Sequence, residues 1–448
     1  MAVPSFFTIP DPDLFQESAL DPLGIMPIWV QYGHSLFNSK LTTIANDVRV
    51  FNFNLFHHYV LFDLFRQYPE AGHRAKERYR DWRTDTDLRT GLIIFLEQLV
   101  SHIFYREGEN DPAIETVGIL GLNKARLSQS TLRPDQIMLR ANKSSGLLRN
   151  QVALGMNGRY KGPMMNMGYF DRSYSYLPKA WDGFGRVIAQ WPEATELAKS
   201  LHQLFLNLLF QAPGRSSPQL SLEVICKSKY YKKIKDGYLI CFGKNTLSSL
   251  LRSYWKDQLG FNSGAPAVLY ELVSKQSDKQ PILHEQIFRE ASSRLSKEPA
   301  EQQKVDRILE LEPFLSAIEY LFRYLAQPDI RRISDVRQEL DLLKSEVLSA
   351  SAIGTDPALP RLNKLIEAAK WTGHLNSWLA NIQAYHQQVS LARGGSPWFE
   401  IDKDGGIKHH YAPLLSESYN TPQKYLSHPF WWHTYYLETL RSVQAGLS

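Results

Sequence analysis

One apolar stretch near the N-terminus constrains the fold of this 448-residue chain more than any other segment. Across residues 43–66, apolar side chains recur at spacings of three and four, which is the repeat of an α-helix. Positions on the opposite side are apolar as well, among them Phe53, Val60 and Leu64. A helix that is apolar on nearly every side has no face suited to solvent. We therefore predict that residues 43–66 form a helix at the centre of a hydrophobic core.

The rest of the sequence favours further helices and few strands. Apolar spacing predicts helices over residues 88–104, 194–210 and 246–259, and a charged segment, residues 73–87, leads into the first of them. Beyond residue 260 the same spacing predicts a consecutive helical array, over residues 281–297, 300–326, 334–350, 358–371 and 373–392. Prolines at the breaks mark the expected helix ends. The predicted fold class is mainly α, a multi-lobed helical protein with a few short β-hairpins.

Two β-hairpins are predicted between the helices. In the first, residues 220–226 and 238–242 form strands that are joined by a Lys- and Tyr-rich connection with an Asp-Gly turn. In the second, residues 398–401 and 407–411 pair around an Asp-Gly-Gly turn.

The segment near residues 133–180 has the rhythm of a winged helix-turn-helix unit. Residues 136–154 predict one or two helices, Asn157-Gly158 a turn, and residues 160–167 a second helix, which a short wing strand would follow. In such units the start of the second helix meets phosphates or base edges. Short helices punctuated by glycine in any α-rich domain give the same pattern, so both interpretations stay open.

Length and composition divide the chain into three predicted parts, since a domain commonly has about 150 residues. Residues 1–120 form an N-terminal arm and helical core. Residues 121–260 form a basic region with the winged-helix unit and the first hairpin. Residues 261–448 form a C-terminal helical array with the second hairpin and a final aromatic helix over residues 422–443.

Positive charge is concentrated in the middle third of the chain. Residues 124–256 contain 21 Lys and Arg but only 7 Asp and Glu, a net charge of +14. Because the whole chain carries +5, the remaining residues together carry −9. Such a polarised field attracts a polyanion to one region. Nucleic acid is the expected partner, and an acidic protein surface is the alternative.

Basic residues in two segments are the candidate nucleic-acid contacts. One group belongs to the predicted winged-helix unit. The other belongs to the Lys- and Tyr-rich connection, where lysines would neutralise phosphates and tyrosines would stack on bases. The complete set is Lys143, Arg149, Arg159, Lys161, Lys227, Lys229, Tyr230, Lys232 and Lys233. For the second group, a merely solvated connection whose lysines prevent strand pairing with other chains is the alternative.

The predicted C-terminal helix gathers aromatic side chains. Trp431, Trp432 and Tyr435 fall on overlapping helical positions. Part of that face is expected in the core, as aromatic stripes usually are. An exposed remainder would form a protein interface, where Trp and Tyr are over-represented. These three residues are therefore the candidate protein interface.

No catalytic, cofactor or metal motif survives inspection of the sequence. Residues 237–246 resemble a phosphate-binding loop only superficially, because five residues separate the glycines instead of four and Asn245 stands between Lys and Thr. The adjacent residues His57 and His58 point apart on a helix, so we expect them to be core or interface groups with hydrogen-bond partners. The two cysteines cannot complete a tetrahedral zinc site alone. We predict no catalytic residue, no cofactor and no metal.

These observations predict a cytoplasmic, non-catalytic protein that binds nucleic acid, DNA in preference to RNA, and joins other protein subunits. The N-terminus does not resemble a signal peptide and no apolar stretch would cross a bilayer, so no membrane partner is expected. As a hypothesis that no motif supports, we place the chain as an accessory subunit in a bacterial complex such as a phage-defence, antiviral system. Two alternatives stay open. One is a scaffold whose basic face meets an acidic partner, and the other is an enzyme whose site is assembled from distant segments.

Overall fold

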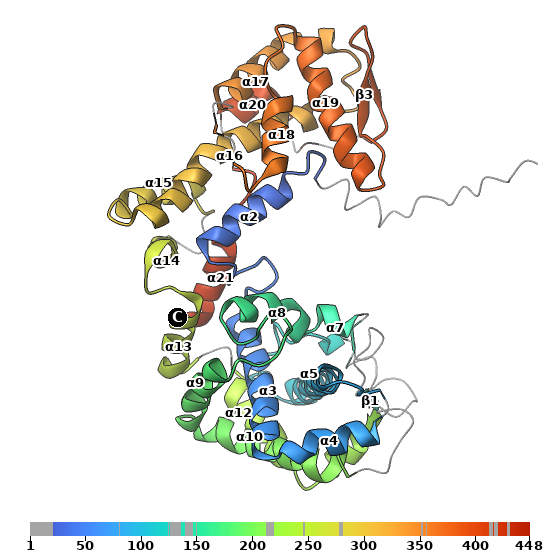
Figure 1. The fold of residues 1–448 in the computed structure, drawn as a ribbon, viewed down its shortest axis with the longest axis vertical. Coiled ribbons are helices and arrows are strands. Elements are labelled where there is room, and N and C mark those ends of the chain that lie inside the picture. Colours follow the sequence, from blue (N-terminus) through green and yellow to red (C-terminus); the bar gives the residue numbers. More distant parts are fainter. Residues whose placement is uncertain are drawn as a thin grey trace, which may run out of the picture. The chain divides into compact units, whose positions relative to one another are not determined.

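The computed structural model describes residues 21–79, 81–123, 125, 136–138, 147–148, 150–211, 219–244, 247–276, 281–350, 353–354, 356–411, 415, 420–427 and 431–448. These residues are mainly helical and include four short strands, which confirms the mainly α prediction. The chain divides into two compact units, whose elements Figure 1 labels. Unit 1 comprises Met1–Leu36 and Ser263–Leu437, and unit 2 comprises Phe37–Asn262 and Glu438–Ser448. Among the described helices, none combines the length and the apolar character that crossing a membrane requires.

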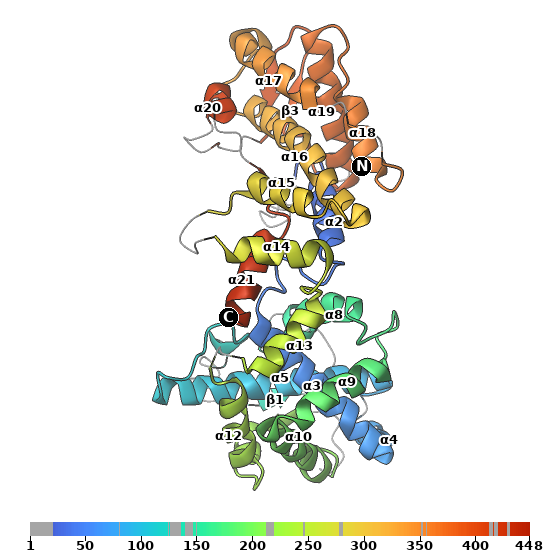
Figure 2. The same ribbon diagram turned by 90° about the vertical axis from the view of Figure 1, so that its left-hand side faces the viewer.

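Unit 2 is built around two long helices, α3 (Val48–Gln67) and α5 (Asp85–Asn110), which run through its middle in Figures 1 and 2. The elements around them are α4 (Pro69–Arg78), β1 (Gln136–Met138), α7 (Gln151–Leu154), α8 (Met156–Asn166), α9 (Pro178–Ala189), α10 (Pro192–Leu204), the π-helix η1 (Phe205–Leu209), β2 (Gln219–Ser221), α11 (Leu222–Cys226), α12 (Tyr231–Phe242), α13 (Ser249–Leu259) and α21 (Leu437–Leu447). Strands β1 and β2 pair antiparallel, with Ile137 opposite Leu220.

Helix α3 confirms the prediction of a central core helix. Every residue from 48 to 61 is buried, as an all-round apolar helix requires. The helix begins later than the apolar pattern because Asp47 caps it. The Asp47 carboxylate accepts hydrogen bonds from the backbone N–H groups of Arg49 and Val50, at 2.8 and 3.3 Å.

The charged segment after α3 is largely helical rather than a simple connection. Helix α4 starts with Pro69 and carries Glu70 in its first turn, both of which favour a helix N-terminus. Thr84 and Asp87 then form a capping box, in which each side chain accepts the other residue's backbone N–H. Helix α5 therefore begins before the predicted position and extends beyond the predicted end.

The first predicted hairpin is wrong. Only Gln219–Ser221 is a strand, and it pairs with β1 rather than with residues 238–242, which belong to helix α12. Ile234, Tyr238 and Phe242 are buried at a spacing of four, so one face of α12 packs into the core. This helical repeat outweighs the Asp-Gly turn signal, because burying three large apolar side chains is worth more than a local turn preference.

The predicted winged-helix unit is not confirmed. Most of residues 133–149 lie outside the described residues. Residues 136–138 form a strand where a helix was predicted, and they pair with a strand far along the chain. The predicted turn at Asn157-Gly158 lies inside helix α8.

Unit 1 confirms the helical array and the second hairpin. Its elements are α2 (Met26–Leu36), α14 (Gly264–Ser274), α15 (His284–Arg294), α16 (Pro299–Leu325), the 3-10 helix η2 (Ile333–Val336), α17 (Arg337–Ala350), α18 (Pro360–Ala368), α19 (Leu375–Ala392), β3 (Phe399–Ile401), β4 (Ile407–His409) and α20 (Pro422–Ser427). Strands β3 and β4 pair antiparallel, with Phe399 opposite His409.

The single aromatic helix predicted over residues 422–443 is wrong. Helices α20 and α21 are separate, and between them Tyr435 and Tyr436 have φ values of 46° and 63°. This left-handed conformation stops a right-handed helix. The backbone N–H of Trp432 instead donates to the buried carboxylate of Glu312 in α16, at 2.7 Å. Hydrogen bonding to α16 therefore overrides the local helical pattern.

Candidate nucleic-acid interface and ligand cavity

Four of the predicted contacts lie at the start of helix α12. We call this surface the α12 basic end, formed by Lys229, Tyr230, Lys232 and Lys233. The three lysines are exposed, and Nζ of Lys229 lies 5.2 Å from the ring centroid of Tyr230. The helix begins with neither a side-chain cap nor an acidic residue in its first turn. Because a helix N-terminus already carries partial positive charge, the added lysines make this end a place that favours phosphate.

Carboxylates neutralise only part of this positive charge. Lys227, the neighbouring predicted contact, forms an ion pair with Glu223 on the same exposed surface. Lys233 lines an open surface pocket that also contains acidic side chains. Lys229 and Lys232 form no ion pair with a carboxylate in the described part of the chain. These two lysines are therefore the best placed to meet an external anion.

Helices α8 and α12 cover different faces of α3. On one face, Nε2 of His57 lies 3.0 Å from the hydroxyl of Tyr238 in α12. On the other, Nε2 of His58 lies 2.9 Å from the amide oxygen of Asn157 in α8. Both histidines are fully buried with hydrogen-bond partners, as the sequence predicts. Since adjacent helical residues point apart, the two partner helices must lie on different sides of α3.

The predicted contacts on α8 consequently belong to a separate surface from the α12 basic end. Arg159 is half-buried, and its Nε donates to a backbone carbonyl at 3.0 Å. Lys161 is exposed, with Nζ 4.1 Å from the ring centroid of Tyr174. Lys143 and Arg149 lie outside the described residues. The structure therefore does not bring the two predicted groups together.

The candidate protein-interface residues of unit 1 differ in burial. Tyr435 is fully buried and belongs to the core. Trp431 and Trp432 are half-buried. The Trp431 ring stacks on Phe288 at 5.3 Å, and the Arg323 guanidinium lies 4.9 Å from the ring of Trp432. A protein interface at the two tryptophans stays a prediction.

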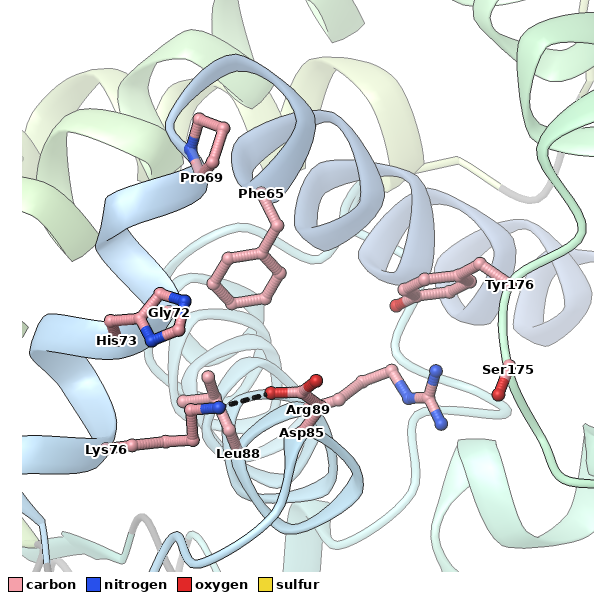
Figure 3. A pocket seen from close by; sticks show the side chains of 10 residues that line it. All are labelled: Phe65, Pro69, Gly72, His73, Lys76, Asp85, Leu88, Arg89, Ser175 and Tyr176. Atoms are coloured by element: carbon pink, nitrogen blue, oxygen red, sulfur yellow. Dashed lines mark hydrogen bonds and ion pairs between the residues drawn. The ribbon is translucent and has the colours of Figure 1, made fainter.

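A cavity of about 420 Å³ opens in unit 2 between α4, the first turns of α5 and the loop before α9 (Figure 3). We call it the Arg89 cavity, and the residues that line it are Phe65, Pro69, Gly72, His73, Lys76, Asp85, Leu88, Arg89, Ser175 and Tyr176. Phe65 and Leu88 give it an apolar wall. Lys76 and Asp85 form an ion pair of 2.6 Å, which compensates the charge of that lysine.

Arg89 carries a positive charge in this cavity that no carboxylate of the described residues neutralises. The side chain is buried, with 8% of its surface exposed. One terminal nitrogen donates to the carbonyl of Tyr174, and the guanidinium lies 4.8 Å from the ring centroids of both Tyr174 and Tyr176. Its Nε–H has no hydrogen-bond partner, and no described carboxylate lies within ion-pair distance. Buried charges are normally paired, so this arrangement calls for an anion.

A buried polar network supports the wall behind Arg89. Glu97 accepts hydrogen bonds from the backbone N–H of Asn157, at 2.8 Å, and from the side chain of Gln151. Burial raises the pKa of Glu97 to about 7 and lowers the pKa of His58 to about 3, so the imidazole is neutral at physiological pH. Tyr176 contacts this histidine and so ties the cavity wall to the core.

Sequence reasoning did not find the Arg89 cavity, because its residues come from segments far apart in the chain. One signal was available: Arg89 and Glu97 are the two residues among Asp, Glu, Lys and Arg in the mostly apolar stretch 88–104. A charged side chain within a buried helix marks a polar network or a ligand site.

No protein-family model matches the chain, and neither does any curated protein or solved structure. Within the part of the chain that the structure describes, no group of three or more His, Cys, Asp and Glu side chains is placed to hold a metal ion. What the chain can bind therefore has to follow from its own charges and cavities.

Proposed function

We propose that unit 2 binds nucleic acid, DNA in preference to RNA, and that backbone phosphates meet the α12 basic end. The charge distribution carries this proposal. Unit 2 contains 32 Lys and Arg against 21 Asp and Glu, a net charge of +11, whereas unit 1 contains 19 against 25, a net charge of −6. The excess positive charge thus belongs to one compact unit, whose field favours a polyanion.

The local geometry of the α12 basic end supports the same proposal. Lys229 and Lys232 are exposed and project from a helix start that has no cap of its own. Tyr230 is half-buried beside Lys229, and an aromatic ring flanked by a cation suits stacking on an unpaired base. Phosphate contacts of this kind give affinity without base specificity.

We propose further that the chain is a non-catalytic accessory subunit of a larger complex. The half-buried side chains of Trp431 and Trp432 on unit 1 are the proposed contact with another protein, because tryptophan often dominates the binding energy of interfaces. The α12 basic end of unit 2 would be the contact with nucleic acid.

Fluorescence anisotropy of labelled duplex DNA, single-stranded DNA and RNA with the full chain tests the proposed function. We expect binding at about 50 mM salt that weakens roughly tenfold or more at about 200 mM, because each neutralised phosphate releases counterions. An absence of binding to all three probes at the lower salt concentration would contradict the proposal. Recovery of one stoichiometric acidic protein that survives nuclease treatment and blocks DNA binding would favour a scaffold instead.

A further inference from the structure

We propose that the Arg89 cavity is a binding site for a small organic phosphate monoester, independent of the α12 basic end. It lies within unit 2, among α4, α5 and the loop before α9, as Figure 3 shows. Its volume of about 420 Å³ is in the range of cavities that enclose small ligands.

The charge state of the cavity requires an anion. Lys76 is already paired with Asp85, whereas the buried guanidinium of Arg89 has only aromatic rings and one carbonyl as partners. Cation–π contacts compensate part of the cost of burying a charge and hold the group in place. They leave its Nε–H unpartnered. An anionic ligand beside the guanidinium would supply the missing charge.

The arrangement of donors favours a phosphoryl group over a carboxylate. Arg89 of α5 and Ser175 of the loop before α9 lie on the same side of the cavity in Figure 3, whereas His73 of α4 lies on the other side. A phosphoryl group that places two oxygens on the guanidinium keeps a third for the Ser175 hydroxyl, whereas a carboxylate has only two oxygens. Arginine suits the phosphoryl group because its planar fork can bind two oxygens at once.

The apolar wall implies that the phosphate carries an organic body. Phe65 and Leu88 lie across the cavity from the Arg89 guanidinium and Ser175, and inorganic phosphate alone would leave this apolar surface uncovered (Figure 3). Burying an aromatic or aliphatic group there gains free energy in proportion to the apolar area removed from water. The ligand class is therefore a phosphate monoester with a compact apolar or aromatic substituent.

Isothermal titration calorimetry of the full chain with phenyl phosphate tests this site, with inorganic phosphate, benzoate and benzyl alcohol as comparison ligands. We expect phenyl phosphate to bind most tightly of the four. Arg89→Met should weaken its binding at least about tenfold, since a charge-assisted contact is lost. The matched control is Arg74→Met, because Arg74 is an exposed arginine of α4 outside the cavity lining. This control should bind like the wild type.

A second variant keeps the test decisive if Arg89→Met does not fold. Gly72 lines the cavity, and a Cβ there would lie 3.6 Å from Phe65, an ordinary contact. Gly72→Leu should therefore fold, fill the cavity and abolish the binding of phenyl phosphate. Three results would overturn the proposal. They are no binding of phenyl phosphate to the wild type, unchanged binding to Gly72→Leu, and weaker binding of phenyl phosphate than of benzoate. Lys229→Ala with Lys232→Ala should leave phenyl phosphate affinity unchanged, which separates this site from the α12 basic end.

Discussion

The hydroxyl of Tyr176 donates a hydrogen bond to Nδ1 of His58 across 3.1 Å. The direction follows from the other ring nitrogen, since Nε2 lies 2.9 Å from the amide oxygen of Asn157, which can only accept. Tyr176 lines the Arg89 cavity, whereas His58 is fully buried on the central helix α3. This pair therefore anchors a wall of the cavity to the core of unit 2.

Replacing Tyr176 with phenylalanine should destabilise unit 2. The substitution leaves Nδ1 of His58 as a buried acceptor without a donor, which costs about 1–3 kcal/mol of unfolding free energy. Urea denaturation monitored by tryptophan fluorescence measures the change in the free energy of unfolding. Tyr68→Phe is the matched control, because Tyr68 is 40% exposed and should tolerate loss of its hydroxyl. Equal losses in the two variants would mean that the contact with His58 contributes nothing.

Stability should fall as pH rises toward neutrality because of Glu97. Burial raises its pKa from 4.5 to about 7, against the hydrogen bonds from Asn157 and Gln151 that lower it. The folded chain thus keeps a proton that the unfolded chain releases near pH 4.5. The free energy of unfolding therefore decreases by about 3 kcal/mol because of this group as the pH rises from roughly 4.5 to 7.

The Glu97→Gln variant isolates that contribution. Because glutamine does not titrate, the variant should lose less stability than the wild type over this pH range, measured by urea denaturation at each pH. Glu109→Gln is the control, as Glu109 is an exposed carboxylate of the same helix. Parallel pH profiles for the wild type and Glu97→Gln would rule out the raised pKa.

Replacing Glu312 with alanine should strongly destabilise unit 1. Its buried carboxylate accepts hydrogen bonds from the indole of Trp29 at 2.7 Å, the hydroxyl of Tyr435 at 2.6 Å and the backbone N–H of Trp432. We expect the free energy of unfolding to fall by roughly 3–5 kcal/mol, because several buried donors lose their acceptor. Thermal unfolding checks the effect. Glu367→Ala, which removes only an exposed ion pair, should change stability by less than about 1 kcal/mol.

The parts of the fold that were predictable are those where local pattern and packing agree. Residues 43–66 have apolar side chains on all sides, and the core indeed encloses α3. Residues 238–242 are helical and not the predicted strand, because the burial of Tyr238 and Phe242 on one helix face outweighs the local Asp-Gly turn signal. The predicted aromatic helix does not form, because Glu312 on the distant helix α16 accepts a hydrogen bond from the backbone of Trp432. No local sequence pattern indicates this contact.

The candidate sites also differ in how far the sequence predicts them. The excess charge of residues 124–256 is a sum over the sequence, so it was visible without coordinates. Whether Lys161 and Lys232 share a surface depends on which faces of α3 their helices cover, and that is a matter of packing. The cavity around Arg89 joins α4, α5 and a loop, so only tertiary structure assembles it.

The salt dependence of DNA binding tests the central claim most directly. We would measure the slope of log K against log salt concentration for the wild type, for Lys229→Ala with Lys232→Ala, and for a control with equal loss of charge in unit 1, Lys297→Ala with Lys364→Ala. The account predicts that the first double variant binds more weakly and has a slope shallower by about 2, since each phosphate contact contributes about 0.9, while the control matches the wild type. Identical slopes for all three proteins would contradict it.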